Sequence, residues 1–165
     1  MSNKVYITPG GARRLRDELN TLYRKTRPEV TKQVKAAAAL GDRSENADYI
    51  YGKKRLREID KRIRYLTKRL DNLVIVDRIP DDRNTVYFGA WVKLEDGGGV
   101  VSELRIVGSD EFDSKLGWIS LESPMGRSLI GKKKETSVLV RLPDGEIELY
   151  ILDISYEPFD EQSQA

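Results

Sequence analysis

Two carboxylates, Asp42 and Glu45, lie three residues apart in the polar segment Leu40–Tyr49. Carboxylate oxygens are ligands that Mg²⁺ prefers, and a protein often supplies only one or two of them to this ion. The chain contains no Cys and no His, which excludes thiolate and imidazole metal sites and His-assisted nucleophilic catalysis. The spacing also fits a capping box, in which Asp42 is the N-cap of a helix and Glu45 bonds back to it. The spacing alone leaves both interpretations open.

The elements that position this pair are two long helices. Thr8 and Pro9 fit the N-cap and first position of a helix. Pro28 interrupts the apolar stripe that follows, so we expect a kink or break at Arg27 before a helix resumes. Gly41 predicts the end of that helix, because glycine adopts positive φ without steric cost.

The clearest periodicity in the chain comes after the turn. Apolar or small residues recur at alternating steps of three and four at Tyr49, Gly52, Leu56, Ile59, Ile63, Leu66, Leu70 and Leu73. This heptad seam predicts a helix from Asp42 to Leu73, about 45–50 Å long, packed antiparallel against the preceding one. Gly52 would let the two helices approach closely near the tip. A spacer or dimerisation role remains open for such a rod.

Charge divides unevenly along the chain. Residues 1–80 contain 20 Lys and Arg against 10 Asp and Glu, whereas residues 81–165 contain 9 against 17. On the second helix, the candidates for contact with RNA phosphates are Lys53, Lys54, Arg57, Lys61 and Arg64. Contacts of this kind are independent of base sequence and weaken with salt. The alternative is an ordinary solvated helix face.

The C-terminal half has the pattern of a small sheet. Alternating runs cover residues 87–94, 100–107, 137–142 and 147–154, with turns at residues 96–99 and 143–145. Ser123 and Pro124 predict the start of a short helix that Gly131 ends. The expected fold class is α+β, with a coiled-coil hairpin at 1–77, a linker at 78–84, a sheet domain at 85–158 and a tail at 159–165.

Three segments of the chain resemble the Gre transcript-cleavage factors, and most closely the GreB branch. They are YITPGG at 6–11, AAALGDRSENADYIYGKKRLREID at 37–60 and SPMGRSLIGK at 123–132. The family usually has Gly-Asp shortly after the last segment, where this chain has Glu135-Thr136. The resemblance implies a C-terminal domain with an FKBP-like fold, containing an antiparallel sheet and one short helix.

The resemblance also implies a function. The hairpin of such a factor enters the secondary channel of bacterial RNA polymerase when the enzyme has backtracked and extruded the RNA 3′ end. Asp42 and Glu45 would hold a weakly bound Mg²⁺ shared with the polymerase, which hydrolyses the RNA itself. Ser44, Asn46 and Tyr49 would support the tip. The residues implied to dock on the polymerase rim are Glu122, Ser123, Pro124 and Met125.

Other functions remain to be weighed against this one. A Gre-like inhibitor would occupy the channel without stimulating cleavage, a prolyl isomerase would use the C-terminal domain, and a simple RNA-binding coiled coil would need no polymerase. The absence of Cys, of an apolar leader and of a long apolar run leads us to expect a cytoplasmic protein without a membrane span. We also expect a monomer. The length of the released RNA fragment does not follow from the sequence.

Overall fold

The computed structural model describes residues 4–159, which divide into two compact units. One unit contains Ala12–Leu73, and the other combines Val5–Gly11 with the chain that follows Leu73. The start of the expected N-terminal domain therefore packs with the sheet unit. Of the tail expected at 159–165, only Phe159 lies within the described residues.

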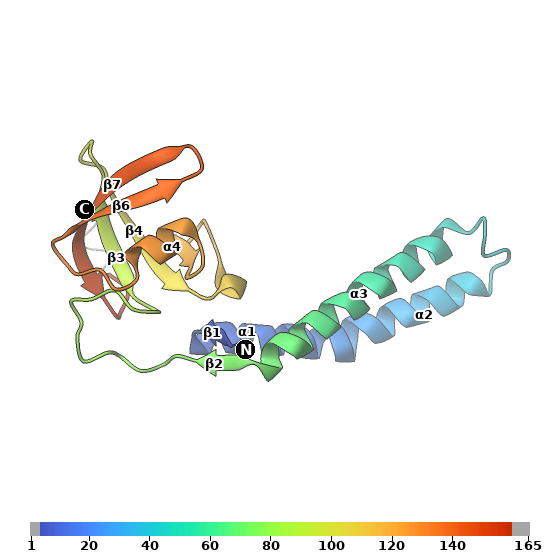
Figure 1. Cartoon of the computed structure of the whole chain (residues 1–165). Coiled ribbons are helices and arrows are strands. Elements are labelled where there is room, and N and C mark those ends of the chain that lie inside the picture. Colours follow the sequence, from blue (N-terminus) through green and yellow to red (C-terminus); the bar gives the residue numbers. More distant parts are fainter. Residues whose placement is uncertain (1–3, 160–165) are drawn as a thin grey trace. The chain divides into compact units, whose positions relative to one another are not determined.

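The helices of the N-terminal half form an antiparallel hairpin (Figure 1). Its elements are α1 (Pro9–Thr21), the π-helix η1 (Leu22–Thr26), α2 (Arg27–Ala38) and α3 (Ala47–Asp71). Val30 and Val34 of α2 are buried against Ile59 of α3. Every position of the predicted heptad seam is buried or half-buried, which confirms the antiparallel pairing.

Of the kink or break expected at Arg27, the break is absent, but a π-helix interrupts the α-helical hydrogen bonding immediately before this residue. The chain stays helical, and the Arg27 amide donates to the Leu22 carbonyl oxygen across a wider turn. Pro28 lies in the first turn of α2, a position where the lack of an N–H is best tolerated in a helix. The π-helix thus accommodates the proline ring, which would otherwise crowd the carbonyl one turn earlier.

The second helix is shorter than predicted. It has 25 residues, about 37 Å at 1.5 Å per residue, and begins at Ala47 instead of Asp42. Gly52 is buried at the interface with α2, as expected from its place in the seam. None of the helices in residues 4–159 combines the length and apolar character that crossing a bilayer requires.

The second unit contains a five-stranded sheet in the order β5-β4-β3-β7-β6. Its strands are β3 (Trp91–Glu95), β4 (Val101–Val107), β5 (Trp118–Ser120), β6 (Ser137–Leu142) and β7 (Gly145–Ser155). The two predicted turns connect the antiparallel pairs β3–β4 and β6–β7. β5 was not predicted and runs parallel to β4, so the sheet is mixed and not wholly antiparallel.

The core of this unit lies between the sheet and α4 (Pro124–Leu129). Val92, Ile106, Ile151 and Leu129 are fully buried within it. Gly131 follows α4 with φ of 82°, as a glycine that ends a helix should. The predicted fold class, a helical hairpin and a sheet domain with one short helix, is confirmed.

A second sheet, also not predicted, pairs β1 (Val5–Ile7) with β2 (Leu73–Ile75). Close to it, the Glu111 side chain is only 2% exposed, at the end of the 3₁₀ helix η2 (Ser109–Glu111). Its carboxylate accepts hydrogen bonds from the Thr8 amide at 3.1 Å, the Gly108 amide at 2.9 Å and the Thr8 hydroxyl. A Cβ on Gly11 would lie 2.2 Å from this carboxylate, so only glycine leaves room for it.

Candidate functional site

Asp42 and Glu45 both lie in the loop between α2 and α3, so the capping box that they could have formed is absent. Asn46 is the N-cap instead, and its side-chain oxygen accepts from the Tyr49 amide at 3.1 Å. The Asn46 side-chain nitrogen donates to the Ala37 carbonyl oxygen at 2.7 Å. One amide side chain thus caps α3 and ties it to the last turn of α2. Asparagine is among the best N-caps, but the sequence offered Asp42 as an equally good one.

The Asp42 carboxylate is ordered by its neighbour Ser44. Its Oδ1 accepts from the Ser44 amide at 3.0 Å and from the Ser44 hydroxyl at 2.8 Å. These bonds, the amide first and then the hydroxyl, hold the pKa of Asp42 below its ordinary value because they favour the charged form. Oδ2 makes no hydrogen bond with the described residues and remains available to a ligand.

Glu45 is exposed, and its carboxylate has no hydrogen-bond or ion-pair partner among the described residues. Gly41, at the start of the loop, has φ of 143° with open space around it. On the other side, the guanidinium of Arg43 lies 5.5 Å from the ring centre of Tyr49, which packs on the hairpin core. The loop therefore presents one oriented carboxylate and one unconstrained carboxylate.

This pair fits a shared cation site better than a complete one. Residues 4–159 contain no group of three or more Asp, Glu, His or Cys side chains that could hold a metal ion. Two carboxylates on an exposed loop would leave most of the coordination sphere of Mg²⁺ to water or to another molecule. The donor types suit Mg²⁺, and Asp42 and Glu45 are the residues that would hold it.

Close approach of the helices continues to the tip. A Cβ added to Gly52 of α3 would lie 2.6 Å from Cγ2 of Val34 on α2. Because a glycine occupies this position, the two backbones come together one turn behind the loop. The loop is therefore supported by a tightly packed base.

The predicted RNA-binding residues of α3 are all exposed: Lys53, Lys54, Arg57, Lys61 and Arg64. Two other charged residues of α3 form hydrogen bonds with the first arm of the hairpin. Asp60 accepts from Arg27 at 2.7 Å, and Arg62 forms a two-point contact with Glu18 at 2.7 and 3.0 Å. None of the five predicted RNA-binding cations takes part in these contacts between the helices.

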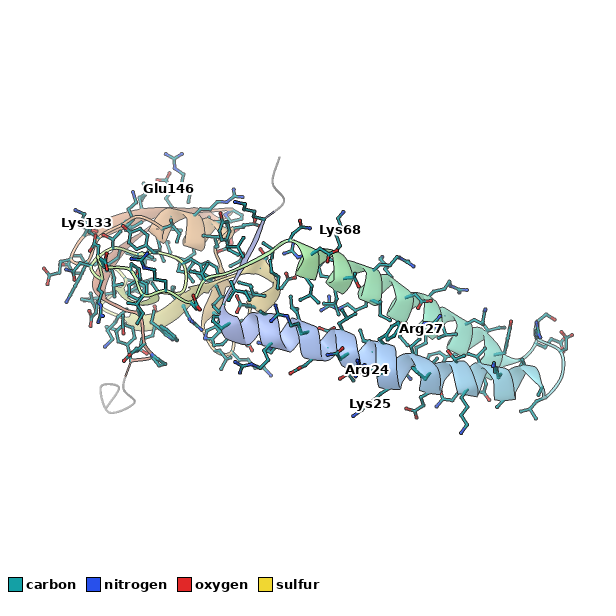
Figure 2. The ribbon with its side chains drawn as sticks, turned by 90° about the horizontal axis from the view of Figure 1, so that it is seen from below. Arg24, Lys25, Arg27, Lys68, Lys133 and Glu146 are labelled. Carbon is teal, nitrogen blue, oxygen red and sulfur yellow. The ribbon has the colours of Figure 1, made fainter. Side chains whose placement is uncertain are left out.

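Sequence reasoning missed basic residues on the first arm. Figure 2 shows Arg24 and Lys25 on η1, and both side chains are exposed. Their positions in the sequence gave no pattern, because the π-helix shifts the helical phase after Thr21. The basic surface of the hairpin is therefore broader than α3 alone.

The docking candidates lie where α4 begins. Ser123 caps this helix by accepting from the Gly126 amide at 3.0 Å and donates to the Ser120 carbonyl oxygen at 2.7 Å. Met125 is half-buried and lines an open apolar groove of about 520 Å³. Glu122 and Pro124 are exposed. The first of these, Glu122, accepts a hydrogen bond from the Ser109 hydroxyl at 3.1 Å.

The described chain is thus a two-part protein, with a helical hairpin that has two carboxylates in its exposed loop and a small mixed sheet. Residues 5–75 match the family described as "Transcription elongation factor, N-terminal", and residues 80–156 match "Transcription elongation factor, GreA/GreB, C-term". The chain therefore belongs to the GreA/GreB family of transcription elongation factors.

Relatives named "Transcription elongation factor GreB" are similar over almost the whole chain. The Pseudomonas aeruginosa protein is 57% identical over 152 residues, which cover 92% of this chain and 90% of that protein. The Yersinia pestis protein is 53% identical over 161 residues, covering 98% and 94%. A solved structure titled "Structure of the transcription factor Gfh1" is 25% identical, covers 93% of this chain and 99% of the other, and has a TM-score of 0.46.

Proposed function

We propose that this chain stimulates the RNA-cleaving activity of RNA polymerase by presenting its acidic loop to the polymerase active site. It is a transcription elongation factor of the GreA/GreB family, whose members stimulate transcript cleavage by RNA polymerase. The proposal rests on one observation. Asn46 caps α3, so neither Asp42 nor Glu45 is needed to start that helix. The hairpin would reach the active site through the secondary channel of a backtracked polymerase.

In this proposal Asp42 and Glu45 hold a Mg²⁺ ion together with polymerase groups. The metal supplies charge stabilisation and lowers the pKa of a bound water. Ser44 keeps Asp42 charged and oriented. The water oxygen attacks the phosphorus, the bond to the upstream 3′ oxygen breaks, and that oxygen takes up a proton. The RNA that stays in the polymerase then ends in a new 3′ hydroxyl. The factor supplies ligands and orientation, and the polymerase performs the reaction.

The rest of the chain positions this loop. Lys53, Lys54 and Arg57, exposed along α3, would bind phosphates of the extruded RNA 3′ end. The apolar groove beside Met125 and the exposed Glu122 would dock on the polymerase rim. A single copy contains both parts, so the factor would act as a monomer inside the cell.

The test uses a backtracked polymerase complex with labelled RNA. Asp42→Asn and Glu45→Gln should each reduce the cleavage rate at limiting Mg²⁺ by at least about ten-fold, with partial recovery as Mg²⁺ is raised. Both variants should compete with the wild-type chain for polymerase. Glu58→Gln removes an equally exposed carboxylate of α3 outside the loop and is the matched control. Normal cleavage by both loop variants would contradict the proposal.

A further inference from the structure

A groove lies immediately behind the acidic loop, between α2 and α3. It has a volume of about 390 Å³, within the range of pockets that accept small organic molecules. Its lining includes the small residues Ala36, Ala37 and Gly52, of which Ala37 and Gly52 are buried. Because Gly52 brings the helices together, the groove is shallow and apolar at its base while both sides carry longer side chains.

The sides of the groove carry groups of different chemistry. Tyr51 lines it and is 66% exposed, so its aromatic ring is accessible from solvent. Arg55 lies one turn after Tyr51, so the two side chains are neighbours on the surface of α3. Gln33 of α2 and Asp48 of α3 also line the groove and add an amide and a carboxylate.

We infer that this groove binds one nucleotide of single-stranded RNA, with its base stacked on Tyr51 and its phosphate bound by Arg55. Proteins bind single strands by combining aromatic rings with a basic track along the backbone. Both components are present here, because Tyr51 and Arg55 line the groove and α3 carries further exposed cations at Lys53 and Lys54. The amide of Gln33 and the carboxylate of Asp48 can hydrogen-bond with the edge of a base.

The positive charge of α3 favours RNA over a protein surface as the occupant of the groove, whose own charged lining residues are Arg55 and Asp48. The exposed side chains that follow Tyr51 on α3 are cationic at Lys53, Lys54 and Arg55, and a phosphate backbone would neutralise them. The inference rests on the proposed function, which brings an extruded RNA 3′ end to the loop. It adds a base-stacking site to a surface for which only phosphate contacts were predicted.

The test measures binding of the whole chain to an RNA hexamer with 2-aminopurine at its 3′ end, at low ionic strength. The fluorescence of 2-aminopurine should fall on binding, because the base stacks on Tyr51. Tyr51→Ala should weaken binding about ten-fold and abolish the fall in fluorescence, whereas Tyr51→Phe should keep both. Alanine is the best helix former, so α3 should persist in this variant, as far-UV circular dichroism would verify.

Tyr23→Ala is the matched control, because Tyr23 is also 66% exposed but lies on η1, outside the groove. It should bind the hexamer like the wild-type chain. Equal weakening by Tyr23→Ala and Tyr51→Ala would overturn the inference, as would Tyr51→Ala binding RNA normally. Loss of polymerase affinity without loss of RNA affinity would assign the groove to a protein contact and would overturn it too.

The same hexamer assay separates this inference from the proposed function. Asp42→Asn should bind the hexamer normally, because Asp42 does not line the groove. If Asp42→Asn and Glu45→Gln both cleave normally in the backtracked complex, the proposed function fails, and the hexamer result still decides the groove. If Asp42→Asn fails in cleavage while Tyr51→Ala binds the hexamer normally, the function stands and the groove assignment falls.

Discussion

Replacing Gly52 with alanine should destabilise the hairpin, although alanine is the better helix former. The added Cβ would lie 2.6 Å from Cγ2 of Val34, closer than two carbon atoms can pack. Val34 is only 9% exposed, and its β-branched side chain has one strongly preferred rotamer in a helix. The clash must therefore be relieved by moving α2 and α3 apart near the tip.

The expected magnitude comes from two opposing contributions. Glycine to alanine in a helix gains about 1 kcal/mol of propensity, and overpacking an interface costs about 1–3 kcal/mol. The net loss should be about 0–2 kcal/mol. Val34→Ala alone should lose about 1.6 kcal/mol, from two buried carbons at about 0.8 kcal/mol each. In that background the clash is gone, so Gly52→Ala should become stabilising by about 1 kcal/mol.

A double-mutant cycle measures this reversal of sign. The free energy of unfolding of the four proteins would be obtained from urea titrations followed by far-UV circular dichroism. Gly10→Ala is a matched control, since its Cβ would meet only the Thr8 hydroxyl, at 4.0 Å, and it should not destabilise α1. If Gly52→Ala stabilises the wild-type chain as much as the Val34→Ala chain, the helices are not in close contact behind the loop.

Three further predictions concern single side chains. Asn46→Ala should lower the free energy of unfolding by about 1–2 kcal/mol in urea titrations, because it removes the N-cap of α3 and the bond to α2. Ser44→Ala should raise the pKa of Asp42 toward its ordinary value, measured by carbon NMR. The Ser44 bonds stabilise the loop above the ordinary pKa of Asp42, and this stabilisation is lost as pH falls through the lowered value. Glu135→Gly should raise the melting temperature, with a gain of up to about 1 kcal/mol, because Glu135 has φ of 64°.

The hairpin could be predicted because its signal is repeated. Seven positions of the predicted seam lie in α3, and all of them are buried or half-buried. The departure at Glu135 was visible too, since the family usually has glycine there. In the structure Glu135 has a positive φ, a backbone conformation that glycine adopts without steric cost. This explains why glycine would suit the position.

The features that could not be predicted depend on single contacts between distant parts of the chain. Glu111 lies 103 residues from Thr8, and nothing local marks it as the carboxylate that binds the Thr8 amide. Pro28 indicated an irregularity near Arg27, but the sequence did not show that it would be a π-helix over Leu22–Thr26. β5 has only three residues, Trp118–Ser120, and its parallel pairing with β4 depends on where the chain returns to the sheet. The local sequence does not give that place.

The capping and metal-binding interpretations of Asp42 and Glu45 fit the sequence equally well, but they predict different effects of mutation on stability. As capping residues, each would lose about 1 kcal/mol on replacement by alanine. In the structure Asn46 caps α3, and both carboxylates are exposed in the loop. Asp42→Ala and Glu45→Ala should therefore change the free energy of unfolding by no more than about 0.5 kcal/mol. A larger loss in urea titrations would return both residues to a structural role, and failed cleavage by these variants would then report a disordered tip.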